Sequence, residues 1–141
     1  MRLTIRAVVL ATMLAGCGGG DADVDDAPQW AGRYFGTVRQ PISCSAGASG
    51  TDTFDQDAPI ATAGKNVVTL DARSPCALTW DVTGTKATLR PRTCVLQGWT
   101  FRYTSGSATL SAPRISWEVS FTFEYMNDVS CAGMLHFDGQ R

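Results

Sequence analysis

Towards the end of the chain apolar and polar residues alternate strictly, and this pattern restricts the fold more than any other feature of the sequence. Every odd position from Ile115 to Tyr125 is apolar or aromatic, and every even position is Ser, Thr or Glu. Successive side chains of a strand point to opposite faces, so this alternation indicates a strand with one buried face. Threonine, valine and aromatic residues, which favour strands, are frequent from Trp30 onward. We therefore predict an all-β domain.

The first strand is predicted over residues 30–39, where Trp30, Tyr34 and Val38 fall on one face. A loop with at most one short strand is predicted to follow over residues 40–65, because prolines, glycines and aspartates interrupt this stretch. The regular part of the fold is therefore expected to resume after this loop.

The other strands are predicted from similar alternating runs, at residues 66–72, 76–82, 86–90, 99–104, 108–112, 115–125 and 130–138. We expect Ser105-Gly106-Ser107 to form a hairpin turn, Pro113 to mark the entry into the longest strand, and residues 126–129 to turn that strand back. About eight strands joined mostly by tight turns predict a small antiparallel meander barrel, with a β-sandwich as the alternative. Membrane-spanning strands need about nine to eleven residues, and most of these runs are shorter, so we expect a water-soluble barrel.

The beginning of the chain is typical of an export signal. An apolar stretch over residues 7–14, too short to span a bilayer, follows two arginines and leads into Leu14-Ala15-Gly16-Cys17. This tetrapeptide resembles the lipobox of bacterial lipoproteins. The resemblance implies that Leu14, Ala15 and Gly16 are the recognition residues, that the signal is cut before Cys17, and that Cys17 is lipidated. The alternative is an ordinary secretory signal with Cys17 as an incidental thiol.

These features divide the chain into three parts. Residues 1–16 are the expected lipoprotein signal peptide, residues 17–29 the lipidated cysteine with a flexible acidic tether, and residues 30–141 a single all-β domain. Several acyl chains on one residue give a stable membrane anchor. The family rule that an aspartate after the lipidated cysteine retains the protein at the inner membrane implies the outer membrane here, because Gly18 takes that position. The expected location is the cell envelope, with the body extracytoplasmic.

Besides Cys17 the chain has an even number of cysteines, namely Cys44, Cys76, Cys94 and Cys131. In an oxidising compartment these are expected to form two disulfides. Spacing alone leaves three connectivities open. The arms around residues 83–85 read as a hairpin, and one extra residue at Pro91 would bring Cys94 opposite Cys76. We therefore favour Cys76 with Cys94 and Cys44 with Cys131.

The segment Trp30-Ala31-Gly32-Arg33-Tyr34-Phe35-Gly36 is similar to the first strand of calycin-type barrels such as lipocalins and the small barrel lipoproteins of bacteria. The resemblance implies a barrel that can hold a ligand. In lipocalins the glycine stands two residues before the tryptophan, whereas here it follows.

The sequence offers no catalytic or metal-binding motif. The single histidine, His136, falls on the polar face of the last predicted strand, which favours a solvent-exposed side chain over a catalytic base. Asp52, Asp55 and Asp57 are interpreted as solvated loop charges, because they lack the rest of a calcium-binding pattern. We expect no enzyme, no cofactor and no metal. The body from Trp30 onward is nearly neutral, which argues against nucleic acid as a partner.

The aromatic residues allow two readings, because side chains can just fill a barrel of this size or leave room for one small ligand. The candidate ligand-facing residues are Trp80, Trp99, Phe101, Trp117 and Phe121. We favour a filled barrel in a lipid-anchored, non-enzymatic structural or interaction module of the cell envelope, with an envelope protein as partner. The alternative is a lipocalin-like carrier of a small apolar ligand, and an enzyme or inhibitor acting through residues 40–65 ranks third.

Overall fold

The computed structural model describes residues 24–125 and 129–141. These residues form nine strands and one helical turn, which confirms the all-β prediction. The elements are α1 (Ala27–Trp30), β1 (Gly32–Cys44), β2 (Ser49–Gly64), β3 (Val67–Leu70), β4 (Leu78–Thr83), β5 (Lys86–Leu89), β6 (Arg92–Leu96), β7 (Trp99–Ser111), β8 (Arg114–Tyr125) and β9 (Val129–Gln140).

The strands form one antiparallel sheet that curls into a nearly closed ring. Their order is β5-β4-β3-β2-β1-β9-β8-β7-β6, and a further pairing of β5 with β7 joins the two sides of the sheet. β5 and β6 both pair with β7, β5 along residues 107–109 and β6 along residues 99–103. They therefore share one position in the ring, and the architecture is the predicted meander of about eight strands.

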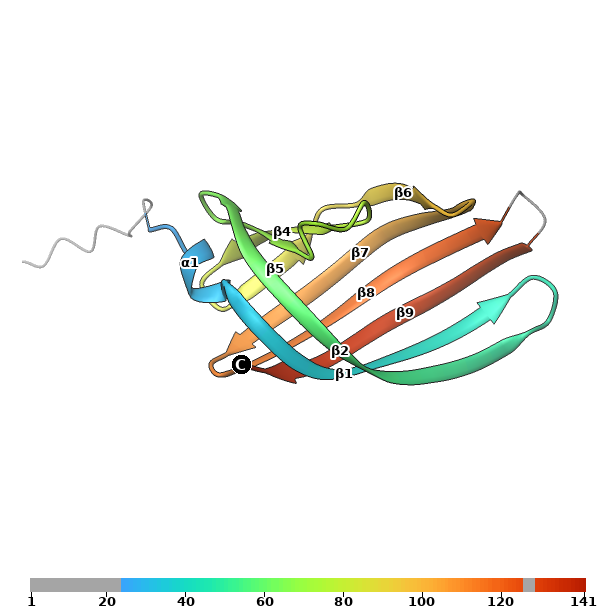
Figure 1. Cartoon of the computed structure of the whole chain (residues 1–141), viewed down its shortest axis with the longest axis horizontal. Coiled ribbons are helices and arrows are strands. Elements are labelled where there is room, and N and C mark those ends of the chain that lie inside the picture. Colours follow the sequence, from blue (N-terminus) through green and yellow to red (C-terminus); the bar gives the residue numbers. More distant parts are fainter. Residues whose placement is uncertain (1–23, 126–128) are drawn as a thin grey trace, which may run out of the picture.

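The two ends of the ring differ because its strands differ in length (Figure 1). At the end near α1, which we call the closed end, β5 pairs with β7 and completes the ring. β3 has 4 residues and β4 has 6, whereas β1 has 13 and β2 has 16. At the other end, which we call the mouth, β1, β2, β7, β8 and β9 therefore extend beyond β3 and β4.

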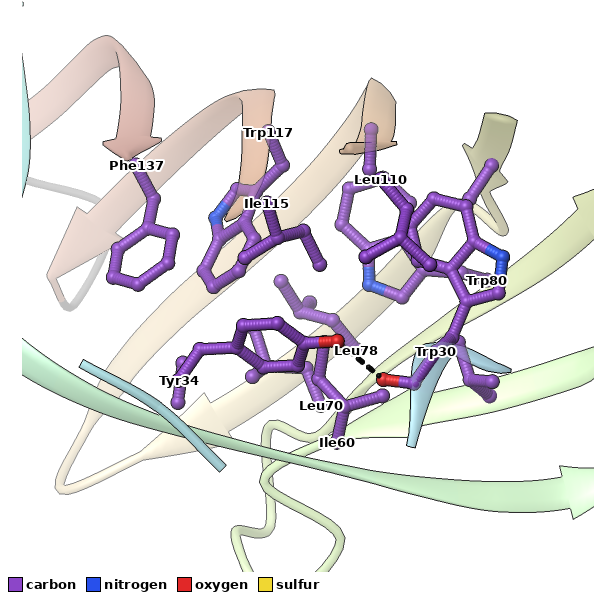
Figure 2. Packing of buried hydrophobic residues seen from close by; sticks show 14 of the residues in the cluster. Trp30, Tyr34, Ile60, Leu70, Leu78, Trp80, Leu110, Ile115, Trp117 and Phe137 are labelled. Carbon is purple, nitrogen blue, oxygen red and sulfur yellow. Dashed lines mark hydrogen bonds between the residues drawn. The ribbon is translucent and has the colours of Figure 1, made fainter. Parts of the chain in front are cut away.

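The closed end is filled with side chains (Figure 2). Trp117 stacks on Phe137 with ring centroids 3.8 Å apart, and the buried Tyr34 hydroxyl donates to the backbone oxygen of Trp30 at 3.1 Å. A residual space of about 10 Å³ remains between Trp30, Trp80, Trp117 and their neighbours. This volume is at the lower limit for a single water molecule, so no ligand fits in this half of the ring. The prediction that Trp30, Tyr34 and Val38 share a buried face holds.

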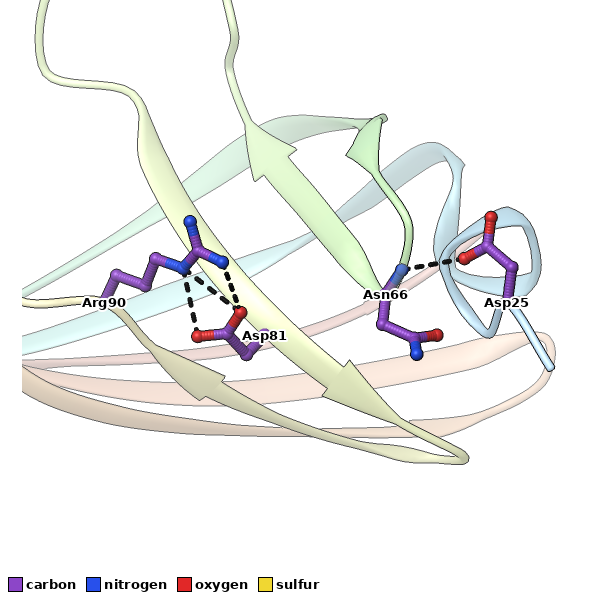
Figure 3. A network of polar contacts seen from close by, with 4 residues as sticks. All are labelled: Asp25, Asn66, Asp81 and Arg90. Atoms are coloured by element: carbon purple, nitrogen blue, oxygen red, sulfur yellow. Dashed lines mark hydrogen bonds and ion pairs between the residues drawn. The ribbon is translucent and has the colours of Figure 1, made fainter. Parts of the chain in front are cut away.

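The ordered domain begins earlier than the expected boundary at Trp30. Trp30 lies in α1 rather than in the first strand, and Ala27 is fully buried. Asp25 accepts a backbone hydrogen bond from Asn66 at 2.8 Å (Figure 3), and Asp26 accepts one from Gly84 at 2.6 Å. The last residues of the expected tether therefore cap the closed end. Their acidic side chains satisfy backbone N–H groups of two turns, a role that composition alone does not reveal.

Arg141 holds the same cap from the other end of the sequence. Its guanidinium donates to the backbone oxygens of Ala31 and Gln29, both at 3.0 Å, and lies 5.4 Å from the centre of the Tyr34 ring. Residues more than a hundred positions apart are thus joined at the closed end.

Residues 40–65 do not form the predicted loop. They contain the end of β1 and all of β2, and these strands pair from Gly32 with Ile60 to Ser43 with Ser49. Beyond Pro59 towards the hairpin tip, β2 has no second neighbouring strand among the described residues. Both faces are largely exposed there, so the strand lacks the apolar alternation by which sequence reveals strands. Proline is tolerated at such an edge.

The predicted turn at Ser105-Gly106-Ser107 is also wrong, because β7 runs continuously from Trp99 to Ser111. The register with β8 shifts between Tyr103 and Ser105, which marks a β-bulge. A Cβ on Gly106 would lie 2.8 Å from the backbone oxygen of Glu118 and 3.1 Å from Leu89. Glycine is therefore needed here for close packing, not for a turn.

Two further predictions concern the longest strand and the turn that follows it. β8 is not the longest strand, because β2 exceeds it by four residues, 16 against 12. The predicted turn at residues 126–129 lies largely outside the described residues, although β8 ends at Tyr125 and β9 begins at Val129.

Ion pairs join neighbouring strands on the outer face. Arg90 binds Asp81 at 2.6 Å (Figure 3), Arg102 binds Glu124 at 2.8 Å, and a third pair links β1 to β2. Hydrogen bonds from these arginines lower the pKa of the partner carboxyls. Solvent screens all these pairs because their side chains are at least partly exposed, so the stability of the ring depends mainly on its core and on the hydrogen bonds between its strands.

We expect Gly36→Ala to lower the free energy of unfolding by about 1–3 kcal/mol. A Cβ on Gly36 would lie 2.0 Å from the backbone oxygen of Asp138, so β1 and β9 would have to separate. Gly50→Ala is the matched control, because a Cβ there meets nothing within 4 Å. Urea unfolding with the disulfides intact measures both variants, and equal stabilities would contradict this close approach of the strands.

We expect acid to loosen the cap at the closed end. Backbone N–H groups of Asn66 and Ala27 lower the pKa of Asp25. A carboxyl whose pKa is lowered by folding stabilises the native state above its unfolded pKa of about 3.9, and this contribution is lost as the pH falls through the folded pKa. The hydrogen-exchange protection factor of the Asn66 amide should therefore fall below about pH 3.9. In Asp25→Ala it should be low already at neutral pH, while Asp55→Ala should behave as the wild type; protection independent of pH would refute the role of Asp25.

Candidate functional site

The inner face of β7 and β8 carries a ladder of aromatic rings at the mouth. The cross-strand pairs are Trp99 with Tyr125, Phe101 with Phe123, and Tyr103 with Phe121. Their ring centroids lie 4.8, 5.8 and 6.2 Å apart, in the range of favourable aromatic pairs. Phe121 is buried and the other five rings are half-buried. The ladder thus leaves ring surface accessible on a concave face.

The rim of the mouth is apolar as well. Phe54 on β2 is 45% exposed and Leu96 on β6 is 41% exposed. They lie on the two strands that border the opening, and Leu96 shares the inner face with its partner Trp99, whereas Val95 pairs with Thr100 on the outer face. A concentration of apolar surface around a concave site is typical of a binding surface.

A cavity of about 230 Å³ lies at the bottom of the mouth, where β3 and β4 stop. Phe101, Tyr103 and Trp117 line one side of it, and Gln56, Asp71 and Ser74 contribute polar groups. Burial raises the pKa of the Tyr103 hydroxyl, and the nearby positive charge of Arg92 opposes this shift. The cavity is therefore mostly apolar with a few polar groups, the composition that small-molecule sites share.

Three contacts fix the β3–β4 loop, residues 71–77, at the edge of this cavity. Arg92 on β6 donates to the backbone oxygens of Ala77 at 2.5 Å and Pro75 at 2.8 Å. The Cys76–Cys94 disulfide joins the loop to the same strand, with a Cα–Cα distance of 5.5 Å. The loop thus takes the place that longer β3 and β4 strands would occupy.

The second disulfide, Cys44–Cys131, joins the mouth ends of β1 and β9. Both pairings are those favoured from the sequence, and the presence of two disulfides is confirmed. Disulfides persist in oxidising environments, so the domain belongs outside the cytoplasm. No helix within residues 24–125 and 129–141 is long and apolar enough to cross a bilayer.

The candidate ligand-facing residues separate into two groups. Trp80 and Trp117 are 4% and 6% exposed and belong to the core of the closed end, although Trp117 also touches the mouth cavity. Trp99, Phe101 and Phe121 belong to the aromatic ladder. The two readings of the aromatic residues thus apply to different halves of the ring, one filled and one open.

The candidate lipobox residues Leu14, Ala15, Gly16 and Cys17 lie outside the described residues, so lipidation stays a prediction.

His136 is half-buried on the outer face, and its Nδ1 lies 3.6 Å from Glu118. The acidic residues of the predicted loop lie on β2, where Arg33 pairs with Asp57 and the Thr37 hydroxyl donates to Asp55 at 3.2 Å. Within the described part of the chain, no three His, Cys, Asp or Glu side chains are grouped as metal ligands would be.

The outer face also has a hollow of about 550 Å³, over β7, β8, β9 and β1. It is open to solvent and lined by short polar side chains with Phe35, Arg114 and Asp138. The mouth, which combines ring surface, depth and fixed polar groups, is therefore the stronger candidate site.

Several residues of the mouth escaped the sequence analysis. Gln56 and Phe54 lay in the predicted loop, Asp71 lay in the strand predicted at residues 66–72, and Leu96 and Tyr125 were not assigned a role. Phe54 pairs with Val38 across β1 and β2. Its place in the mouth could have been predicted only if β2 had been recognised as a strand, and the polar composition of β2 concealed this.

No family model matches the chain, and no curated protein matches it. A solved structure from Bacteroides ovatus, described as a structural genomics protein of unknown function, is 16% identical to this chain with a TM-score of 0.46. The match covers 79% of this chain and 42% of that one, so this chain spans less than half of its length.

We expect Arg92→Met to loosen the β3–β4 loop, because two charge-assisted hydrogen bonds are lost while the aliphatic stem is kept. The loss of about 1 kcal/mol should raise amide hydrogen exchange in residues 71–77 several-fold. Arg90→Met is the control, since Arg90 pairs with Asp81 on the outer face. Unchanged exchange in the loop of Arg92→Met would show that the disulfide alone fixes it.

Proposed function

We propose that this protein is a lipid-anchored lipoprotein of the bacterial cell envelope whose domain is a non-enzymatic interaction module. The observation that carries the proposal is the position of the mouth. The apolar rim and aromatic ladder lie at the opposite end of the ring from α1, where the chain enters the domain (Figure 1). The domain therefore offers its binding surface away from its point of attachment.

The length of the tether supports this arrangement. Asp25 is fixed at the closed end and lies eight positions after Cys17 in the sequence. A chain spans at most about 3.6 Å per residue, so these eight reach no more than roughly 29 Å. A lipid on Cys17 would keep the closed end near the bilayer and present the mouth to the surrounding compartment. Gly18 after the cysteine favours the outer membrane.

A second candidate function is that of a carrier of a small apolar ligand. The cavity at the bottom of the mouth favours it, because about 230 Å³ is more than packing alone leaves in a filled barrel. The filled closed end argues against a long ligand held along the ring axis. The two candidates share one surface and differ in whether it holds a protein or a small molecule.

Membrane retention tests the anchor. We expect Cys17→Ser to release the protein from the membrane fraction, because the thiol that accepts the lipid is lost, whereas Gly20→Ser should leave it membrane-bound. Labelling cells with an alkyne fatty acid should mark the wild type and Gly20→Ser but not Cys17→Ser. A Cys17→Ser protein that still pellets with membranes and carries the label would refute the lipobox interpretation.

A further inference from the structure

We propose that the mouth cavity binds a planar molecule of one or two rings that carries a hydroxyl or N–H group at its edge. This proposal rests on the proposed role of the mouth as a binding surface and specifies its ligand. The size of the cavity comes first. A cavity of about 150 Å³ accepts benzene, and pockets for drug-sized ligands begin at about 300 Å³. The mouth cavity, at about 230 Å³, lies between these limits.

The aromatic side of the cavity favours a flat ligand. The rings of Phe101 and Tyr103 are nearly parallel, with an interplanar angle of 11° and centroids 6.4 Å apart. Both rings are half-buried, so part of their surface is open to a ligand. Trp117 closes the bottom and is held there by its stack on Phe137. A ring placed here gains contact with ring surface without rearrangement of the wall.

The backbone that carries the polar side is held by hydrogen bonds before any ligand binds, and the Asp71 side chain is exposed. Asp71 has a left-handed backbone conformation, with φ of 50°, and its N–H donates to the backbone oxygen of Pro59 at 2.9 Å. Its own carbonyl accepts from Ser74 N–H at 2.8 Å, and the Ser74 hydroxyl accepts from Cys76 N–H at 3.1 Å. The loop therefore offers a carboxylate acceptor and a hydroxyl whose hydrogen is left to donate.

Charge and composition exclude other classes of ligand. Among the described residues that line the cavity, Asp71 is the charged one, so an anionic ligand is disfavoured. Most of the lining is apolar, so a sugar with a hydroxyl on each carbon would leave polar groups unpaired. A neutral ring with one hydrogen-bond donor satisfies each condition.

Indole and 1-methylindole form a matched pair of probes, because they differ in the donor N–H. Titration of the disulfide-bonded protein, followed by two-dimensional NMR, should show saturable binding of indole with shifts at Phe101, Tyr103 and the 71–77 loop. We expect 1-methylindole to bind at least tenfold more weakly, and methyl glucoside to bind no better than 1-methylindole. Indole binding should be weakened about tenfold in Asp71→Gly, which suits the local backbone, and unchanged in Asp55→Ala on the outer face.

A second variant tests the cavity independently of Asp71. Gln56→Trp places a large side chain in the cavity and should abolish indole binding with the fold retained. If this variant does not fold, the result for Asp71→Gly still tests the proposal.

Absence of saturable binding by both indoles would overturn the proposal. Equal binding of the two would overturn the need for a donor and leave the apolar carrier, and tighter binding of methyl glucoside would overturn the ligand class. Fractionation of Cys17→Ser tests the envelope role separately, because it does not depend on the cavity.

Discussion

Three residue pairs between β5 and β7 convert this sheet into a ring. Lys86, Ala87 and Thr88 pair with Thr109, Ala108 and Ser107, and through them the first half of the sheet meets the second. Small side chains make this contact feasible, since Ala87 and Ala108 face the core between larger neighbours. Gly106, beside these pairs, lies so close to Leu89 and to the backbone of Glu118 that a Cβ would not fit. Ring closure thus depends on small residues at one seam, and the tryptophan-rich core forms behind it.

Closure at one end leaves the other end open. The seam involves only the later part of β7, because its earlier part pairs with β6. β3 and β4 are short and end at the closed half of the ring, whereas the long strands continue into the mouth. The aromatic residues of β7 and β8 then alternate onto an inner face beyond the ends of β3 and β4. The accessible rings of the mouth are therefore a consequence of unequal strand lengths, not of a separate insertion.

The sequence predicted the parts of the fold where burial is one-sided. β8 could be placed because its odd residues contact the core and its even residues contact water. The Cys76–Cys94 pairing was predicted correctly, although the expected hairpin ends at Leu89 and Cys94 lies on β6, which pairs with β7. β2 could not be placed, because around Asp52 both of its faces are exposed and alternation carries no apolar signal. Gly106 was misread for a related reason. A glycine needed for close approach and a glycine needed for a turn look alike until the neighbouring strand is known.

The candidate site could also be predicted only in part. Trp99, Phe101 and Phe121 could be recognised as inward-facing from their alternation, but their distribution between a filled and an open half depends on where β3 and β4 end. Asp71 and Ser74 gain their significance from the β3–β4 loop, whose position is set by contacts with β6 far along the chain. Such long-range contacts are not encoded in any local pattern.

The two disulfides lie at the mouth, one joining a loop to the edge strand β6 and one within the β1–β9 ladder. At the closed end each strand has neighbours on both sides, and the cap is held by hydrogen bonds from Asp25, Asp26 and Arg141. At the mouth, β6 lacks a strand on its outer side and the β1–β2 hairpin extends past β3. One disulfide fastens the β3–β4 loop to β6, and the other fastens β1 to β9 at the last pair of their ladder. Cross-links restrict the chain at this end of the ring, so they keep the mouth in one shape while leaving its aromatic surface uncovered. A surface of this kind would otherwise collapse onto itself, and its maintenance by covalent bonds supports a role in binding.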